Sequence, residues 1–294
     1  MHANRNWQRC GTALGFFALG FFAAVSMLGG VSGCGKLTTG ANTVPTVKYR
    51  ADASAVVEET STTPTEVVTT DAGGIGTFKG RVVFEGSFSP PAPRFAKGAA
   101  TNDPTVCGAE AIPDERIIVN GDGLANVFVY LEKAPKGVKP AAVTDKIDFD
   151  QKTCIFLPHA MVVRTKQLVN VLNDDAAAHN THTFPTKGSS FNSVIQPNDR
   201  VGVPLKYDQS EKQPVSVRCD IHSWMQAYHL PLDHPFAAVS KGDGSFEIKD
   251  LPAGEHKFLV WHEVGLVLEK SLVITIKPGD NEITIKVPAS KLGK

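Results

Sequence analysis

The chain has 294 residues, and its 30 basic residues balance its 30 acidic residues, so the formal net charge is zero. This balance excludes a strong electrostatic field, and we therefore expect no nucleic acid partner. The length allows one or two domains with cores of their own. With 26 glycines and 19 prolines beside many valines and threonines, the composition favours strands joined by turns, and we expect an all-β protein.

Residues 1–33 have the layout of a secretory leader. Arg5 and Arg9 precede the apolar run "GTALGFFALGFFAAVSMLGGVSGC", which ends in small residues. The end of this run resembles the lipobox of bacterial lipoproteins, which implies that Cys34 receives lipid and becomes the new N-terminus. We therefore expect a lipid-anchored protein of the cell envelope that faces the periplasm or the exterior. Simple secretion and a membrane-spanning anchor are the alternatives, since the run is barely long enough to span a bilayer.

The predicted elements after the leader are a tether and then strands. Residues 34–75 are rich in threonine and have no sustained apolar period, which predicts a disordered tether. From residue 76, "TFKGRVVFEG" and "ANVFVYLEKAP" alternate as strands do, on either side of a long proline-containing loop. Residues 147–234 are short apolar segments separated by turn residues, at the spacing of a β-sandwich. Residues 235–294 predict further strands, with a hairpin through Gly242–Gly244, and no amphipathic helix is expected.

The cysteines fall into distinct groups. Cys10 lies in the leader and Cys34 would carry lipid, so three thiols remain in the folded part, at Cys107, Cys154 and Cys219. In an oxidising compartment an odd number indicates one disulfide and one thiol kept for another use. Cys107 and Cys154 lie outside any metal-like cluster, and pairing them leaves Cys219 free. The alternative is that both are reduced and buried.

The stretch "VRCDIHSWMQAY", residues 217–228, brings three soft ligands together. Cys219, His222 and Met225 follow one another at three-residue steps and supply a thiolate, an imidazole and a thioether. This set suits copper better than zinc, calcium or magnesium. About forty residues earlier, "NDDAAAHNTHTFP" carries His179 and His182, and either would complete the two imidazoles and one thiolate of a type 1 copper centre.

The segments "AHNTHTF" and "CDIHSWM" together resemble the ligand pattern of the cupredoxins, and of amicyanins in particular. The resemblance implies a Greek-key β-sandwich over residues 147–234 with one type 1 copper site. The ligands that it implies are His179, Cys219, His222 and, in the axial position, Met225. It also implies that the side chain of Asn180 ties the two ligand loops together.

Other residues near these segments have more than one reading. His182 is expected to face solvent, to form a hydrogen bond beside the site, or to replace His179 as a ligand. Trp224 lies inside the ligand loop, where its ring would shield the metal, contribute to a docking surface, or simply pack in the core. A partly buried turn is expected for His159, and a surface or strand-end position for His229 and His234.

The flanks have a resemblance of their own. "GTFKGRVVFEG" with "LANVFVYLE", and "VSKGDGSFEIKDLPAGEHKFLVWHE", resemble the two halves of a carboxypeptidase regulatory-like, or transthyretin-like, β-sandwich. This implies that residues 76–146 and 235–294 form one sandwich without catalytic residues, with the copper domain inserted between them. One enlarged sandwich with continuous sheets is the alternative.

The function expected from these patterns is one-electron transfer by copper, without enzymatic activity. No pairing of a nucleophile with a base stands out in the sequence. The expected partner is a redox protein such as a cytochrome, a dehydrogenase or an oxidase, and lipid on Cys34 would provide the membrane contact. A copper delivery protein and a metal-free surface binding module are the alternatives.

Overall fold

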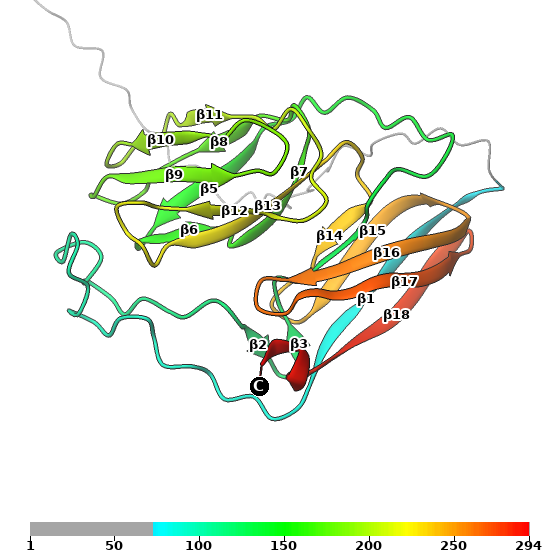
Figure 1. Cartoon of the computed structure of the whole chain (residues 1–294), viewed down its shortest axis with the longest axis horizontal. Helices are drawn as coiled ribbons and strands as arrows, with labels where there is room; N and C mark the ends of the chain where they lie inside the picture. The colour runs from blue at the N-terminus through cyan, green and yellow to red at the C-terminus, as the bar shows by residue number, and fades with distance from the viewer. Residues whose placement is uncertain (1–72, 294) are drawn as a thin grey trace, which may run out of the picture. The chain divides into compact units, whose positions relative to one another are not determined.

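The computed structural model describes residues 73–293, and this part of the chain is built almost entirely of β-strands (Figure 1). The strands form four sheets, which pair into two β-sandwiches. The expected all-β class is thus confirmed. The predicted leader, and the predicted tether up to residue 72, lie outside the described residues. Between residues 73 and 293 no helix has the length and apolar character needed to cross a membrane.

The first sandwich, which we call the flanking sandwich, takes its strands from both ends of the described chain. One sheet has the order β15-β1-β3-β2, with β18 paired to β1 on its other edge. Its strands are β1 (Ile75–Glu85), β2 (Val119–Asn120), β3 (Gly123–Leu124), β15 (Ser245–Pro252) and β18 (Gly279–Pro288). The second sheet has the order β14-β4-β16-β17. Its strands are β4 (Phe128–Leu131), β14 (Ala237–Val239), β16 (Gly254–His262) and β17 (Leu266–Ile276).

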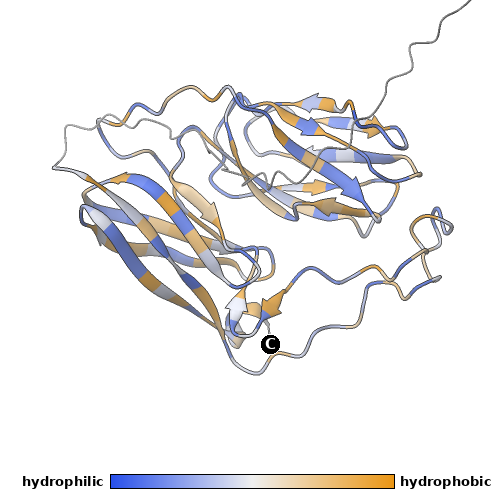
Figure 2. Cartoon of the chain, turned by 180° about the vertical axis from the view of Figure 1, so that it is seen from behind, coloured by the Kyte–Doolittle hydropathy of each residue, from blue (hydrophilic) through white to orange (hydrophobic). Residues whose placement is uncertain are grey.

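Strand β1 shows why these residues form a sandwich. Its side chains alternate between buried and more exposed positions, so Phe78 and Val82 face the core while Lys79 and Arg81 face solvent. Figure 2 shows the same alternation of apolar and polar residues along the strands. One face of the sheet is therefore apolar and needs a second layer to cover it.

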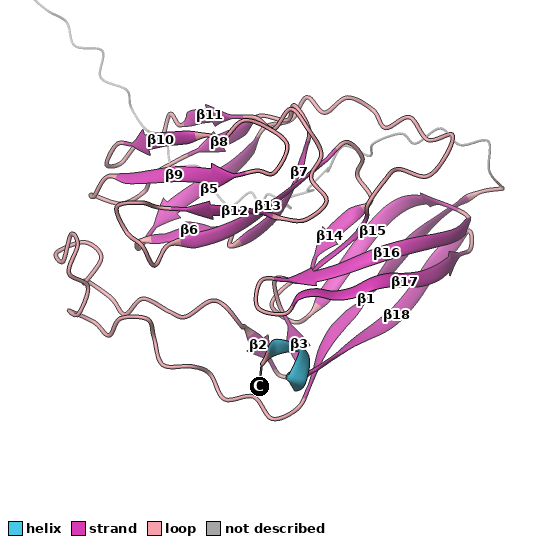
Figure 3. Cartoon of the chain, viewed as in Figure 1, coloured by secondary structure: helices cyan, strands magenta, loops and turns pink. Residues whose placement is uncertain are grey.

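Turns and loops connect the strands, and several of these connections cross from one layer to the other. Figure 3 shows strands joined by loops, with one short helix, η1 (Ala289–Leu292), near the end of the described chain. The hairpin predicted through Gly242–Gly244 is wrong in its pairing: the turn is present, but β14 pairs with β4 while β15 pairs with β1. Turn residues determine a local reversal of the chain, but they do not determine which open strand edge the next strand joins.

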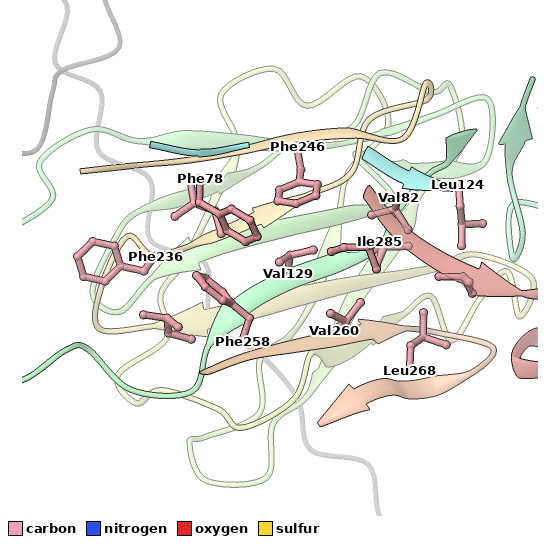
Figure 4. Packing of buried hydrophobic residues seen from close by; sticks show 14 of the residues in the cluster. Phe78, Val82, Leu124, Val129, Phe236, Phe246, Phe258, Val260, Leu268 and Ile285 are labelled. Atoms are coloured by element: carbon pink, nitrogen blue, oxygen red, sulfur yellow. The ribbon is translucent and has the colours of Figure 1, made fainter. Parts of the chain in front are cut away.

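The core of the flanking sandwich lies between its two sheets. Figure 4 shows aromatic rings from both layers in contact, and the Phe78 and Phe258 ring centroids are 4.7 Å apart. Phe246 packs edge-on against Phe78 at 5.3 Å. Burying such rings is among the largest apolar contributions a side chain can make, so this cluster stabilises the pairing of distant chain segments.

The second sandwich, which we call the central sandwich, spans residues 147–232. One sheet has the order β10-β9-β12-β13-β7 and the other has the order β11-β8-β5-β6. The first contains β7 (Ala160–Arg164), β9 (His179–Phe184), β10 (Asn192–Ile195), β12 (Val215–Arg218) and β13 (Gln226–Leu232). The second contains β5 (Ile147–Lys152), β6 (Ile155–Leu157), β8 (Val169–Val171) and β11 (Val203–Leu205).

The long loop between β1 and β2 also contributes to the core of the central sandwich. Ala100, Cys107 and Ile112 of this loop belong to the same buried cluster as Phe149 and Val217. The predicted disulfide is confirmed, because Cys107 is bonded to Cys154 in the turn between β5 and β6. Cys219 is a free, buried cysteine, as expected.

Candidate metal centre

The candidate ligands come together because two antiparallel strands end at the same edge of a sheet. β9 begins at His179, and β12 ends at Arg218, immediately before Cys219. In the register of these strands, Arg218 lies opposite His182. The start of β9 and the end of β12 are therefore adjacent, which brings the two segments of the predicted pattern together.

Two imidazoles and one thiol meet at this edge. The Nδ1 atoms of His179 and His222 are 2.9 Å apart, and Cys219 Sγ lies 3.7 Å from His222 Nδ1. Ligand atoms of these three residues all lie within 4.8 Å of one another, and all three residues are buried. A second group combines Cys154, Asp175 and His179, but the disulfide removes the Cys154 thiolate as a ligand.

The chain from Cys219 to Met225 is a closed loop. The Cys219 N–H donates to Met225 O at 3.3 Å, and the Met225 N–H donates to His222 O at 2.9 Å. Met225 is 1% exposed and belongs to the same apolar cluster as Cys219. The loop therefore holds an imidazole, a thiol and a buried thioether within seven residues.

The Cys219 sulfur accepts hydrogen bonds from the backbone. The N–H groups of Asn180 and His222 donate to Sγ at 3.4 and 3.3 Å. Burial raises the pKa of this thiol, but hydrogen bonds from His179, His222 and the two amides outweigh burial and lower the pKa to about 6. Cys219 is thus a thiolate at neutral pH, and the thiolate is the form of cysteine that binds metal.

Asp175 fixes the orientation of His179. Its carboxylate accepts from His179 Nε2 at 2.9 Å and from the backbone N–H groups of Thr153 and Cys154 at 2.7 and 2.8 Å. Burial lowers the pKa of His179, but the bonds to Asp175 and Cys219 outweigh it and raise this pKa to about 9. Because Nε2 carries a hydrogen toward Asp175, loss of one proton from the ring leaves Nδ1 free to bind a metal.

The residues expected beside the ligands form a hydrogen-bonded cluster. The Asn180 side-chain oxygen accepts from the N–H of Asp220 at 2.6 Å, which joins the His179 segment to the ligand loop. His182 lies outside the buried group, and its Nδ1 is 3.0 Å from the Asp220 carboxylate. Trp224 donates from Nε1 to Cys154 O at 3.0 Å, and its ring centroid is 5.1 Å from that of His222.

Two carboxylates at the site were not identified from the sequence. The sequence favours a turn for Asp174 and Asp175 over a site for a hard cation, although the position of Asp175 four residues before His179 was an available signal of their contact. Asp103 lies 3.0 Å from His222 Nε2, and it comes from the long loop between β1 and β2, more than a hundred residues earlier. Only the pairing of Cys107 with Cys154 hints that this loop reaches the site.

Three other histidines are more buried than expected, although His159 lies in the expected turn, between β6 and β7. His229 and His234 are fully buried and not at the surface, and burial lowers their pKa values to about 3 and about 4. The Nδ1 atom of His229 and the Tyr207 hydroxyl are hydrogen-bonded at 2.9 Å. His159 is buried between Glu263, at 2.5 Å from Nε2, and Glu115, at 3.7 Å from Nδ1.

The donor set fits copper. One thiolate and two imidazoles whose Nδ1 atoms face each other, with Met225 in the same buried cluster as Cys219, are soft and intermediate ligands of the kind that copper prefers. Structural zinc sites use four strong ligands, and a thioether is not one of them. Calcium and magnesium require oxygen ligands, which this group lacks.

Of the comparisons with known proteins, the comparison with solved structures gives matches. No family model matches the sequence, and no curated protein matches it. A purple cupredoxin from Nitrosopumilus maritimus aligns at 15% identity over 29% of this chain and 98% of its own, with a TM-score of 0.25. A reduced amicyanin variant aligns at 14% identity over 31% of this chain and 86% of its own, with a TM-score of 0.27.

A copper-containing nitrite reductase from Thermus scotoductus SA-01 also aligns, at 14% identity and a TM-score of 0.27. The alignment covers 32% of this chain and only 25% of that enzyme. All of these TM-scores are below 0.5, so the likeness by itself does not establish the function of this chain.

Proposed function

We propose that this protein is a type 1 copper protein that carries single electrons at the cell envelope. The observation that carries the proposal is the convergence of His179, Cys219 and His222, whose ligand atoms lie within 4.8 Å of one another in a buried site. When bound, copper would supply the Cu(I)/Cu(II) couple. His179, Cys219 and His222 would hold the ion, and Met225 would supply a weak thioether ligand.

The surrounding residues hold the donor atoms in place before metal binds. Asp175 holds His179 through Nε2, and the amides of Asn180 and His222 hold the sulfur. The loop bonds between Cys219, His222 and Met225 limit movement of the other donors. A site that is rigid and dry changes little in geometry when an electron is gained, which favours fast transfer.

Burial of the group favours electron transfer over copper delivery. His179 and His222 have no exposed surface, and Cys219 is 2% exposed. A delivery protein must pass its ion to an acceptor, which needs ligands that the acceptor can reach. An electron can cross buried side chains, so a closed site is compatible with the carrier function.

A metal-free binding module accounts less well for the same residues. A buried thiolate beside two imidazoles costs free energy unless a partner compensates for the loss of water. The mutual hydrogen bonds of His179, Cys219 and His222 provide part of that compensation, and a bound copper ion would provide the rest.

The anchor and the partner belong to the proposal as well. The leader and the lipobox-like segment ending at Cys34 support attachment by lipid to a membrane of the envelope. A redox protein such as a cytochrome, a dehydrogenase or an oxidase would then exchange electrons with the copper centre, and no catalytic role is assigned to the flanking sandwich.

The test is copper content and redox cycling of the purified protein. The wild type should bind one copper per chain, and the bound copper should be reduced and reoxidised repeatedly without loss of metal. Cys219→Ser should lose most of the copper, while Cys219→Ser folding is checked by circular dichroism. Equal copper content in the two proteins would refute the site, and tight copper binding without reversible cycling would favour storage or delivery.

A further inference from the structure

A segment from outside the central sandwich covers the ligand loop. Residues 94–112, which we call the cap, belong to the long loop between β1 and β2. The backbone of Phe95 is bridged to that of Ile112, which closes the cap into a loop of its own. Ala100, Cys107 and Ile112 are buried in the core cluster that also contains Cys219 and Met225.

The cap is attached to the central sandwich by contacts of three kinds. The disulfide joins Cys107 to Cys154. The Asn102 side-chain amide donates to Ile221 O in the ligand loop at 2.6 Å. The Phe95 ring packs edge-on against Trp224, with centroids 4.9 Å apart. The polar and apolar contacts thus place the cap against residues 219–225, and the disulfide fixes it to the turn between β5 and β6, whose Cys154 carbonyl accepts from Trp224.

Asp103 is the cap residue that reaches a predicted copper ligand. Its carboxylate lies 3.0 Å from Nε2 of His222, and the His222 side chain has no exposed surface. Asp103 has a φ of 47°, a left-handed conformation that Asp adopts more readily than most residues. Its backbone oxygen accepts from the N–H groups of Val106 and Cys107, so the same turn leads directly to the disulfide.

We propose that the cap closes the metal centre on its His222 side and that Asp103 is a positioning residue for the His222 imidazole. This inference rests on the proposed copper site and adds to it a group that the ligand pattern does not contain. Nε2 donates its hydrogen to Asp103, which leaves the Nδ1 lone pair for the metal and fixes the ring orientation. The disulfide keeps Asp103 in place.

The cap also limits the access of solvent to the site. With His222 covered, water and small solutes have no direct path to its ring, and the outer edge of the hydrogen-bonded unit is the Asp103 carboxylate, whose side chain is 46% exposed. The surface presented on this side is therefore formed by the cap and not by the ligand itself.

The first test is copper affinity, measured by competition with a chelator. Asp103→Ala should weaken copper binding about tenfold, the lower end of the range for such partners of a ligand histidine. Asp103→Asn keeps an acceptor oxygen for Nε2–H and should recover most of the loss. Glu110→Ala is the matched control, because Glu110 is an exposed cap carboxylate paired with Lys97, and it should bind copper as the wild type does.

The second test needs no metal. Cys219 should react slowly with an alkylating reagent in the metal-free wild type, and at least about tenfold faster in the Cys107→Ser/Cys154→Ser double variant, in which the cap is released. Circular dichroism of the double variant shows whether the sandwiches remain folded. Asp103→Ala keeps the disulfide and should increase the alkylation rate of Cys219 by a smaller factor. It tests closure by the cap even if the double variant is unfolded.

The proposed copper site and the proposed role of the cap can be refuted separately. If the wild type binds no copper, the proposed function fails, while the alkylation test still applies to the cap. If the wild type binds copper but Asp103→Ala and Glu110→Ala have equal affinity, the role of Asp103 is refuted. Equal alkylation rates for the folded double variant and the wild type would refute closure by the cap.

Discussion

His179 is bonded through both ring nitrogens, and the two bonds have different consequences. Nε2 faces Asp175 at 2.9 Å, and Nδ1 faces His222 at 2.9 Å. The first bond sets the orientation of the ring, and the second places Nδ1, the atom that we propose as a copper ligand, beside His222. In the metal-free protein the pKa of His179 is raised to about 9 and the pKa of Cys219 is lowered to about 6. At neutral pH this buried pair is therefore an imidazolium and a thiolate.

Asp175→Asn should weaken copper binding by about 10- to 100-fold, because His179 loses the anion that holds it. It should also raise the pKa of Cys219 in the metal-free protein, since the imidazolium that stabilises the thiolate is itself less stable. Asp174→Asn is the matched control, because Asp174 pairs with Lys152 at the surface. Equal affinities for the two variants would contradict the assigned role.

The Cys219 thiolate gives a pH dependence with a definite sign. Above about pH 6 the thiol should be ionised, and below that pH protons should compete with copper for the sulfur. The difference in ultraviolet thiolate absorbance between wild type and Cys219→Ser, followed across pH, measures this ionisation directly. A midpoint near the ordinary value of 9.0 would contradict the hydrogen bonds assigned to the sulfur.

The sequence predicted which candidate ligands come together, but not the two aspartates that form hydrogen bonds with the candidate histidine ligands. The spacing of Cys219, His222 and Met225 is weak evidence by itself, because buried cysteine and methionine are ordinary core residues. It predicts a soft-metal site only together with an upstream histidine, and the role of Asn180 follows from a resemblance. Asp103 and Asp175 are common loop aspartates. The position of Asp175 four residues before His179 hints at their contact, but nothing in a single sequence shows that Asp103 lies against His222.

In the flanking sandwich, the pairing of β1 with β18 requires the two backbones to approach closely at Gly80. A Cβ atom placed on Gly80 would lie 2.1 Å from the backbone oxygen of Ile283 in β18. Since β1 pairs with both β15 and β18, neither neighbour can move away without breaking a ladder. Glycine at this position is therefore a packing requirement.

Gly80→Ala should lower the free energy of unfolding by about 1–3 kcal/mol, the usual range for overpacking. Gly242→Ala is the control, because a Cβ atom there would meet nothing within 4 Å. Urea denaturation of both variants gives the comparison. A Gly80→Ala protein as stable as the Gly242→Ala protein would show that β1 and β18 are less tightly paired than described.

The order of strands was predicted better than their pairing. Alternating residues such as Phe78 and Val82 predict a strand with one buried face, because the period of two belongs to a single segment. Pairing depends on residues far away. The parallel pairing of β1 with β18 joins Gly76 to Gly279, and no local pattern indicates it.

For the molecule as a whole, His159 joins parts of the described chain that are distant in sequence. It lies between β6 and β7, Glu115 lies in the loop that carries the cap, and Glu263 lies between β16 and β17. Burial lowers the pKa of His159, but the bonds to the two glutamates outweigh burial and raise the pKa to about 9. The folded protein thus favours the imidazolium form.

The contribution of His159 to stability should be complete below its ordinary pKa of 6.5 and should be lost as the pH rises through about 9. The wild type should therefore lose more free energy of unfolding over this range than His159→Gln. His256→Gln, which removes a histidine that has no carboxylate partner among the described contacts, is the control. Parallel pH profiles for wild type and His159→Gln would contradict this account.

Copper titration of the metal-free protein, followed by visible absorption and EPR, is the decisive test of the proposed copper site. A strong thiolate-to-copper absorption band and a type 1 EPR signal should appear, saturate at one copper per chain and be absent from Cys219→Ser. If the folded wild type gives no such band, or if the band persists in Cys219→Ser, the buried group of His179, Cys219 and His222 is not a type 1 copper site.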